Sequence, residues 1–518
     1  MSKVTILWAD DEIEILKPHL FFLEKKGYEV LTVTNGNDAI DEVMGDQQID
    51  VVFLDESMPG LTGLETLARI KSAKPNIPVV MITKNEAENI MEEAIGSQID
   101  DYLIKPVNPN QILLSLKKII DNKRLVQEKT ASDYQVEFRK IIMEIQDVRT
   151  FEEWATMYKK IISWELKLDD GNVDQMSEIL NMQKTEANAA FSKFIEKHYE
   201  NWIQKPDSAP IMSHNLMRKY VFSQLDEKPT VLFLLDNLRF DQWKILEPII
   251  NERFRIHQED FFYSILPTST QYSRNSIFAG MFPSEIQKHY PDWWLNDNEE
   301  GGKNLKEKEL FEAQISRLMH NKNIKSDYQK ITKLAHAKTM QDNVYNLLNN
   351  DISVIVYNFI DMLSHARTEM EVLKELAGDE KAYRSLTRSW FLNSPLWQAM
   401  QRLSERDVRM IITTDHGTIR VKQPSKVIAD KDTTTNLRYK VGKNLQYDRK
   451  EVLEVREPSK VGLPRPNMSS KFIFAKNDTF FLYPNNYNYY QRYFNDTFQH
   501  GGISLEEVIC PFITLYPR

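Results

Sequence analysis

The chain has 518 residues, which is too many for one hydrophobic core and predicts two to four domains. Its composition, 42% hydrophobic and 27% charged, is that of an ordinary globular protein. The formal net charge of -9 disfavours a protein that wraps a nucleic-acid backbone, because such proteins usually carry a basic face.

The single cysteine, Cys510, excludes an intrachain disulfide and a thiolate-rich zinc site. It lies in the apolar run Val508–Phe512 and is expected to be a small buried residue. The start of the chain has no basic region followed by a long apolar run, and no uncharged stretch reaches membrane-spanning length. We therefore expect a cytoplasmic protein without a membrane span.

The N-terminal part alternates strand and helix patterns. Apolar runs at Val4–Trp8, Val51–Leu54 and Val79–Ile82 predict buried parallel strands. Helical spacing between them is found at Ile13–Lys26 and Leu64–Lys74. This order predicts a small doubly wound α/β domain whose functional groups lie at the carboxyl ends of its strands.

Acidic and hydroxyl side chains follow these strands. Three carboxylates that meet in one crevice repel each other unless a divalent cation joins them, and oxygen ligands select magnesium or manganese. One carboxylate can then accept a phosphoryl group, whose oxygens a lysine and a hydroxyl can bind. The residues at these positions are Asp10, Asp11, Asp55, Thr83 and Lys105.

The segments Asp55–Gly60 and Tyr102–Pro106 resemble the response-regulator receiver family, and the resemblance extends from Val4 to about Asn122. It implies a phosphoacceptor at Asp55, magnesium ligands at Asp10, Asp11 and Asp55, phosphoryl-binding groups at Thr83 and Lys105, and an aromatic switch residue at Tyr102. Lys84 departs from the pattern, since many receivers have a small residue after the switch threonine.

The middle of the chain loses the alternation and becomes helical. Apolar residues recur at helical spacing from Phe138 to Ile161, and Thr150 with Glu153 predicts a capping box at the start of a helix. Two interpretations stay open: a spacer bundle packed on itself, or a dimerisation or signal-relay element.

From Thr230 onward, polar side chains again follow apolar strands or lie in glycine turns. Mixed carboxylate and imidazole ligands suit zinc, or manganese if oxygen dominates, and six ligands suffice for two incomplete sites. Two such metals can clamp the attacking and leaving oxygens of an in-line phosphoryl displacement. Asp236 follows Val231–Leu235, Asp361 and His365 follow Val354–Ile360, Asp415 and His416 follow Arg409–Thr414, and His500 precedes Gly501 and Gly502.

This ordered pattern resembles the alkaline phosphatase superfamily, most closely its PglZ branch, over most of Thr230–Arg518. The resemblance implies one zinc site of Asp361, His365 and His500. It implies a second zinc site of Asp236, Asp415 and His416, shared with the nucleophile.

Nucleotide phosphodiesterases of this superfamily carry a Pro-Thr-x-Thr motif, which Pro267–Thr270 matches. The resemblance makes Thr270 the expected nucleophile, with Thr268 and Ser269 as weaker candidates. Those enzymes place a phosphate-binding asparagine three residues after the nucleophile, where this chain has Ser273. The phosphate-binding role is therefore expected of Ser273, Arg274 or Asn275.

The region Phe480–Phe498 is rich in Tyr, Phe and Asn. The favoured interpretation places these aromatic residues at a core edge or over the metal cleft. The alternative is a surface on which nucleobases stack.

The predicted fold class is α/β with three domains: a doubly wound receiver at 1-122, a helical linker at 123-205 and an alkaline-phosphatase-like α/β domain at 206-518. The two ends together resemble response regulators that carry a PglZ domain and are linked to type IX secretion. That resemblance implies a sensor histidine kinase, and contacts with a sigma factor or the secretion machinery.

The expected function is a zinc-dependent phosphodiesterase acting on nucleotides or oligonucleotides, controlled by phosphorylation of Asp55, which would also shift a dimerisation equilibrium. The alternative is a phosphorylation-switched protein-binding regulator whose metals are structural. A DNA-binding transcription factor is disfavoured, because no helix-turn-helix pattern with a basic recognition helix is found.

Overall fold

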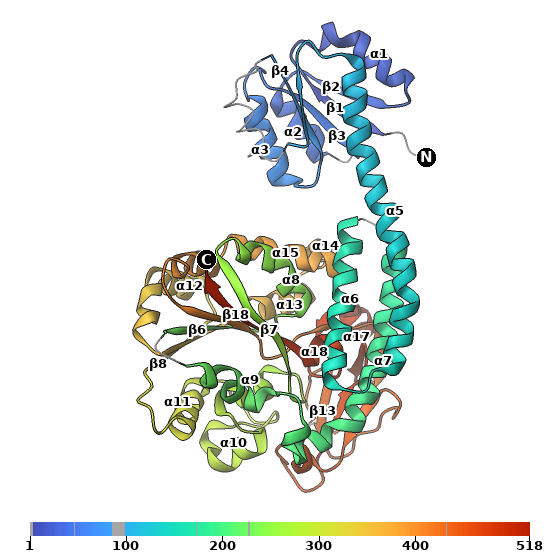
Figure 1. Ribbon diagram of the computed structural model, residues 1–518. Helices are drawn as coiled ribbons and strands as arrows, with labels where there is room; N and C mark the ends of the chain where they lie inside the picture. Colours follow the sequence, from blue (N-terminus) through green and yellow to red (C-terminus); the bar gives the residue numbers. More distant parts are fainter. Residues whose placement is uncertain (1–3, 46, 85–98, 172–173, 226–227, 431–432) are drawn as a thin grey trace. The chain divides into compact units, whose positions relative to one another are not determined.

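The computed structural model describes residues 4–45, 47–84, 99–171, 174–225, 228–430 and 433–518 (Figure 1). Two compact units are formed, Met1–Asp133 and Tyr134–Arg518. Among the helices described, none is long and apolar enough to cross a membrane.

The first unit contains a five-stranded parallel sheet of order β2-β1-β3-β4-β5. The central strands are buried along their whole length, as expected of a parallel sheet covered by helices on both faces. The strands are β1 (Thr5–Ala9), β2 (Glu29–Val33), β3 (Val51–Asp55), β4 (Val79–Thr83) and β5 (Asp101–Ile104), and the helices between them are α1 (Lys17–Lys25), α2 (Gly36–Met44) and α3 (Gly63–Ala73). This confirms the predicted doubly wound domain.

The first helix of this unit starts later than predicted. Ile13–Leu16 forms a 3₁₀ turn, and the α-helix begins only at Lys17, with Pro18 in its first turn. Proline is favoured at that place because the first backbone amides of a helix have no internal acceptor.

Three long helices follow: α5 (Pro109–Asp147), α6 (Phe151–Gly171) and α7 (Asp174–Gln204). The capping box is confirmed, since Thr150 Oγ1 accepts from Glu153 N at 3.2 Å and Glu153 accepts from Thr150 N at 3.0 Å. Trp154 and Phe191 share one hydrophobic core with Phe233 of the C-terminal sheet. The middle helices therefore pack on the C-terminal domain, while the three-domain division stays a prediction.

Helix α7 also holds the segment that follows His500. Asn188 Oδ1 accepts from Leu505 N at 2.7 Å, and Asn188 Nδ2 donates to Glu506 at 3.1 Å. Lys184 forms an ion pair with Glu506 at 3.5 Å. Asn188, Leu505 and Glu506 are buried, so each polar partner matters for the fold.

The C-terminal sheet has six strands in the order β7-β18-β10-β6-β9-β8. Strands β10, β6, β9 and β8 are parallel, whereas β18 and β7 are antiparallel additions at one edge. Their bounds are β6 (Thr230–Leu235), β7 (Phe254–Tyr263), β8 (Ser326–Ile331), β9 (Ile352–Tyr357), β10 (Arg409–Thr413) and β18 (Ile509–Pro517).

Helices and small sheets surround this sheet (Figure 1). The helices are α8 (Phe240–Asn251), α9 (Thr270–Ala279), α10 (Pro283–His289), α11 (Glu307–Leu318), α12 (Leu334–Asp342), α13 (Phe359–Glu369), α14 (Glu371–Leu376), α15 (Glu380–Leu392), α16 (Pro395–Leu403), α17 (Tyr487–Phe494) and α18 (Leu505–Val508). The short strands pair as β11 (Ile419–Arg420) with β17 (Phe498–Gln499), β12 (Gln423–Lys426) with β16 (Thr479–Leu482), and β13 (Tyr439–Gly442) with β15 (Lys471–Ala475) and β14 (Val452–Val455).

The strand predicted over Val354–Ile360 ends earlier, at Tyr357, and α13 begins at Phe359. Asp361 therefore lies in the first turn of a helix, where a carboxylate is favoured by the helix dipole. The aromatic region divides in two: Phe480, Phe481 and Phe498 are core residues, whereas α17 has no buried residue.

Lys440 in β13 is 1% exposed, and its Nζ donates to Thr434 O at 2.9 Å. Burial lowers the pKa of Lys440 to about 7. An unfolded lysine has a pKa of roughly 10.4, so between pH 7 and 10 the unfolded state binds more protons and stability rises with pH.

We expect Lys440→Met to raise the free energy of unfolding by about 2–4 kcal/mol at pH 7. The gain over the wild type should shrink to below about 1 kcal/mol by pH 10, because pH 10 is close to the pKa of the unfolded lysine and little of the protonation difference remains. Urea unfolding at pH 7, 8.5 and 10 measures this, with the exposed neighbour Lys443→Met as control. A gain independent of pH would contradict the buried-amine explanation.

Candidate active site

The structure brings the six predicted zinc ligands of the C-terminal domain into two clusters. Within each cluster the ligand atoms lie within 4.8 Å of one another. The first cluster consists of Asp361, His365 and His500, and the second of Asp236, Asp415 and His416.

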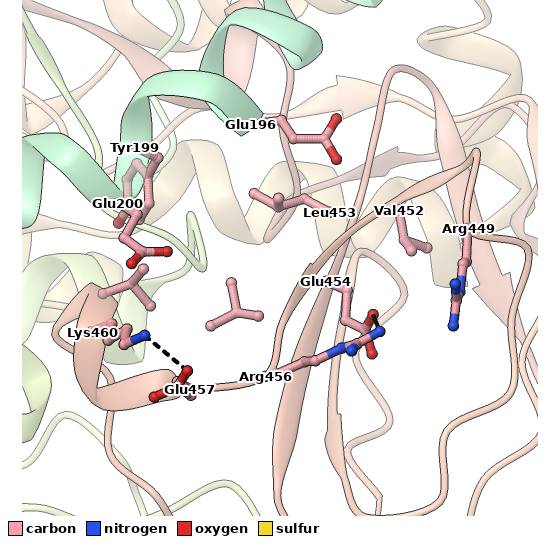
Figure 2. A pocket seen from close by; sticks show the side chains of 12 residues that line it. Glu196, Tyr199, Glu200, Arg449, Val452, Leu453, Glu454, Arg456, Glu457 and Lys460 are labelled. Atoms are coloured by element: carbon pink, nitrogen blue, oxygen red, sulfur yellow. Dashed lines mark hydrogen bonds and ion pairs between the residues drawn. The ribbon is translucent and has the colours of Figure 1, made fainter.

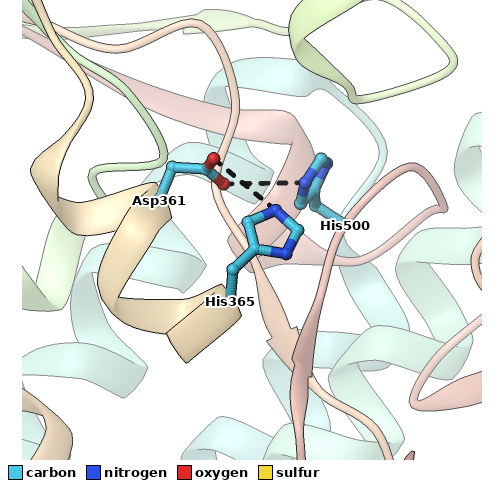
Figure 3. Close-up of side chains that lie close together, drawn as sticks. All are labelled: Asp361, His365 and His500. Atoms are coloured by element: carbon cyan, nitrogen blue, oxygen red, sulfur yellow. Dashed lines mark ion pairs between the residues drawn. The ribbon is translucent and has the colours of Figure 1, made fainter. Parts of the chain in front are cut away.

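The first cluster forms where α13 faces the turn after β17. Asp361 and His365 are four residues apart on α13, so both side chains lie on one face of the helix. His365 Nε2 is 3.6 Å from Asp361 Oδ2, and His500 Nε2 is 3.7 Å from Asp361 Oδ1 (Figure 3). His500 Nδ1 lies 3.2 Å from Thr268 O, a contact that fixes the imidazole and turns Nε2 toward the cluster.

The second cluster is fully buried at the carboxyl ends of β6 and β10. His416 Nε2 lies 3.8 Å from Asp236 Oδ1 and 3.7 Å from Asp415 Oδ2. These two carboxylate oxygens accept no hydrogen bond from the residues that the structure describes. The rings of His416 and His500 stack with centroids 4.2 Å apart, so the two clusters are neighbours.

The electrostatics of both clusters fit divalent cations. Burial and the nearby Asp236 carboxylate raise the pKa of Asp361 and of Asp415 to about 6. Burial opposes ionisation of Asp236, but Arg274 and His416 outweigh it and hold its pKa below the usual range. Burial, His416 and His365 together keep the pKa of His500 well below normal, so this imidazole is a neutral ligand. A cation between these groups would relieve the repulsion of the carboxylates.

Thr270, the expected nucleophile, begins helix α9 beside the second cluster. Its Oγ1 lies 3.2 Å from His416 Nε2, and its carbonyl accepts from Asn304 Nδ2 at 3.0 Å. Its side chain is half-buried, whereas Thr268 and Ser269 are buried and Thr268 Oγ1 donates to Gly502 O. Thr270 thus brings its hydroxyl into contact with a predicted metal ligand, and it does so at the amino end of a helix, which favours anions.

The three residues expected to bind phosphate have internal partners. Ser273 Oγ donates to Asp415 O at 2.6 Å, and Asn275 Nδ2 donates to Lys303 O at 3.1 Å. Arg274 is 1% exposed; its Nη1 donates to Asp236 and its Nε donates to Glu307, both at 2.6 Å. In this conformation Arg274 neutralises buried carboxylates.

Asn237 is a site residue that the sequence interpretation missed. It lies directly after Asp236 in the left-handed region with φ 68°, and its Nδ2 lies 3.4 Å from Asp361 and 3.1 Å from Ser364 Oγ. Its buried Oδ1 accepts no hydrogen bond in the part of the chain that is described. Its signal in the sequence is an asparagine at a strand end, a residue that tolerates positive φ.

In the receiver, Asp10, Asp11 and Asp55 form a third carboxylate cluster. Lys105 Nζ lies 2.9 Å from Asp10 and 3.0 Å from Asp55. Burial raises the pKa of Asp55, which favours a bound cation. The triad fits magnesium, because its ligands are all oxygens.

The switch residues lie around this triad. Thr83 ends β4, and its Oγ1 donates to Glu56 at 2.5 Å. Tyr102 lies in β5 and is half-buried. Lys84 forms an ion pair with Glu12 at 2.7 Å, which joins the loops after β1 and β4.

A pocket of about 460 Å³ lies elsewhere, between α7 and the sheet that contains β14 (Figure 2). Its lining includes Glu196, Tyr199, Arg449, Arg456 and Lys460, and none of the predicted site residues is among the residues that line it. The predicted chemistry therefore lies outside this pocket.

Comparison with known proteins assigns three regions. Residues 6–117 match the response regulator receiver domain, residues 124–203 the PorX response regulator linker domain, and residues 216–515 the BREX system PglZ alkaline phosphatase-like domain. Fold and matches together define a response regulator whose receiver is joined to an alkaline phosphatase-like domain. Because the last match covers more than half of the chain, the protein belongs to the PglZ family, and with its receiver and linker it is a PorX-like response regulator.

Several curated regulators are similar to this chain over about a quarter of its length. The alginate biosynthesis transcriptional regulatory protein AlgB of Pseudomonas syringae is 35% identical over 120 residues, 23% of this chain and 27% of that protein. The transcriptional regulatory protein ResD of Bacillus subtilis is 29% identical over 119 residues, 23% of this chain and 49% of that protein. The chain thus spans between about a quarter and a half of the length of these relatives.

Among solved structures, a CheY-like receiver domain protein from Methanospirillum hungatei is 26% identical, with a TM-score of 0.23, and covers 23% of this chain and 96% of that chain. A receiver domain protein from Clostridium thermocellum is 32% identical, with a TM-score of 0.23, and covers 24% of this chain and 98% of that chain. The receiver domain implies a cognate histidine kinase.

Proposed function

We propose that the C-terminal domain is a zinc-dependent phosphodiesterase that acts on nucleotides or short oligonucleotides and is controlled by phosphorylation of Asp55. The observation that carries the proposal is the Thr270 hydroxyl, 3.2 Å from His416 Nε2 beside two adjacent Asp and His clusters. A nucleophile next to two cation sites suits phosphoryl displacement.

In the proposed reaction, Thr270 Oγ forms a bond to phosphorus and one ester oxygen leaves as an alcohol after taking up a proton. Water then attacks the phosphothreonine, which releases the phosphate monoester and restores the threonine hydroxyl. Bound zinc would act as a Lewis acid that neutralises charge on the phosphoryl oxygens. Asp361, His365 and His500 would hold one ion, and Asp236, Asp415 and His416 the other, with manganese as the alternative metal.

The contacts of Ser273, Arg274 and Asn275 do not support a direct phosphate-binding role in this conformation. We assign that role instead to Asn237, because its Nδ2 lies 3.4 Å from Asp361 of the first cluster and its backbone N lies 3.4 Å from Asp415 of the second. In the proposed complex, Nδ2 exchanges its long contact with Asp361 for a phosphoryl oxygen.

In the proposed regulation, a sensor histidine kinase phosphorylates Asp55 in the presence of magnesium. Thr83 and Lys105 bind the phosphoryl group, and Tyr102 reports its presence to the surface. The resulting shift favours a homodimer and contacts with a sigma factor or a type IX secretion component. These partners are inferred from the PorX-like architecture.

The test is hydrolysis of bis-p-nitrophenyl phosphate and of p-nitrophenyl phosphate by zinc-loaded full-length protein. Each assay is run with and without acetyl phosphate, and Asp55→Asn serves as the control that cannot be phosphorylated. We expect the diester to be preferred and its turnover to change with acetyl phosphate only when Asp55 is present. A preference for the monoester would make the domain a phosphatase. No turnover of either compound, with two zinc ions bound, would favour a protein-binding regulator with structural metals.

A further inference from the structure

Helix α17 presents aromatic side chains to solvent. Five of its eight residues are Tyr or Phe, yet no residue of the helix is buried. Tyr489 is 62% exposed and Tyr490 is 40% exposed. One face of the helix packs on a small core, where Tyr487 and Phe494 are partly buried, so the exposed Tyr489 and Tyr490 are the rings that require another explanation.

The rings of this helix are ordered against each other. Tyr489 and Tyr493 lie nearly parallel at 13° with centroids 6.1 Å apart, and Tyr490 and Phe494 lie at 15° and 6.0 Å. Tyr489 and Tyr490 meet edge to face at 5.2 Å. The rings therefore form two stacked pairs that restrict each other's rotamers. Less side-chain conformational entropy is then lost when a flat ligand binds on them.

Cations lie over the rings of α17. The chain has 75 acidic residues, but none occurs between Asp478 and Asp496. Lys374 Nζ lies 4.8 Å from the centre of the Tyr493 ring, and Arg492 is exposed on the helix itself. Lys426 Nζ lies 5.4 Å from the Tyr487 ring, and Asp496, just after the helix, is paired with Arg420 at 3.2 Å. Aromatic faces with cations beside them suit single-stranded nucleic acid, whose bases stack and whose backbone is anionic.

Helix α17 is connected to both elements that hold the first Asp and His cluster, α13 and the turn after β17. His500 follows Phe494 by only six positions, a length of backbone that spans at most about 20 Å. Arg367, two residues after His365 on α13, donates to Asp496 O at 2.5 Å, and its guanidinium lies 4.9 Å from the Phe498 ring. A chain of a few nucleotides is therefore long enough to reach from α17 to the cluster.

We propose that α17 is a stacking subsite for the bases of a single-stranded oligonucleotide whose phosphodiester lies at the Asp and His clusters. The inference rests on the proposed function and deepens it, since it favours oligonucleotides over mononucleotides. Tyrosines flanked by cations, without aliphatic residues on the helix, favour bases over a protein partner.

The test measures binding of a 5′-fluorescein-labelled single-stranded hexadeoxyadenylate by fluorescence anisotropy. Zinc-loaded full-length Thr270→Ala is the parent, so that binding is read without turnover. Tyr489→Ala with Tyr490→Ala removes two rings, and Tyr489→Phe with Tyr490→Phe keeps them. Tyr345→Ala, at a tyrosine that is 38% exposed outside α17, is the matched control.

We expect the alanine pair to raise the Kd about 10-fold or more, and the phenylalanine pair and Tyr345→Ala to stay within about twofold of the parent. An alanine pair that binds like Tyr345→Ala would overturn the proposal, as would a phenylalanine pair that binds as weakly as the alanine pair. Unchanged oligonucleotide binding with lost self-association in sedimentation would identify a protein contact instead.

Binding and hydrolysis measured side by side separate the stacking subsite from the proposed phosphodiesterase activity. If the wild type hydrolyses no diester but oligonucleotide binding depends on the two rings, the subsite stands and the proposed enzyme is wrong. If diester hydrolysis is found but binding ignores the rings, the enzyme stands and the subsite is wrong.

Discussion

Replacement of Thr270 by alanine is expected to lower hydrolysis of bis-p-nitrophenyl phosphate at least about 1,000-fold while two zinc ions stay bound. The loss should be large because the hydroxyl beside His416 is the proposed attacking group, and water at that place is a weaker, less well positioned nucleophile. The metal content should not change, because the carboxylate and imidazole ligands are all retained. Steady-state kinetics and elemental analysis of the same preparation measure both quantities.

Thr270→Ser is the matched control, since it keeps a hydroxyl on the first residue of α9 and should keep measurable turnover. Thr268→Ala and Ser269→Ala test the weaker candidates in the same assay. If Thr270→Ala keeps full activity and Thr268→Ala or Ser269→Ala is inactive, the inactive variant identifies the nucleophile and Thr270 is not it.

Arg274→Met is expected to destabilise the zinc-free protein by about 3–5 kcal/mol. The arginine is buried between Asp236 and Glu307, and its removal leaves Asp236 without its cation, whereas Glu307 keeps Lys330 at 2.9 Å. Zinc should restore part of the loss, because a bound cation would again neutralise Asp236. Urea unfolding in the presence of EDTA and of zinc measures both effects.

Two controls sharpen this prediction. Arg253→Met replaces an exposed arginine and should change stability by less than about 0.5 kcal/mol. Adding Asp236→Asn to Arg274→Met should recover stability in EDTA, because the buried charge that has lost its cation is removed. A variant with unchanged stability and a raised KM for the diester would instead support the phosphate-binding role first expected of Arg274.

The ligand clusters were predictable because they follow a rule of topology. In parallel sheets the carboxyl ends of neighbouring strands meet at one edge, so Asp236 after β6 and Asp415 after β10 are brought together by strand order alone. The same rule gathers Asp10 and Asp55 in the receiver. His365 was predictable from its spacing to Asp361 on a helix.

The partners of Arg274 were not predictable in this way. Glu307 lies on α11, thirty-three positions further along the chain, and its contact with Arg274 depends on how α11 packs against α9. Tyr328 of β8 then donates to the second oxygen of Glu307 at 2.5 Å. Such contacts depend on side-chain packing between insertions, for which neither periodicity nor a motif gives a signal.

The hydrogen bonds and the ion pair between α7 and the segment after His500 limit where the chain can be truncated. Asn188 and Lys184 belong to the linker, yet they hold Leu505 and Glu506, which lie just beyond a proposed metal ligand. A fragment that starts at residue 206 would lose these contacts and would also expose the core side of Phe233 that Trp154 and Phe191 help to cover. The smallest piece of this chain that can keep the two Asp and His clusters intact therefore begins near Tyr134, so the linker helices are part of the folding unit of the C-terminal domain and cannot be exchanged for an unrelated linker.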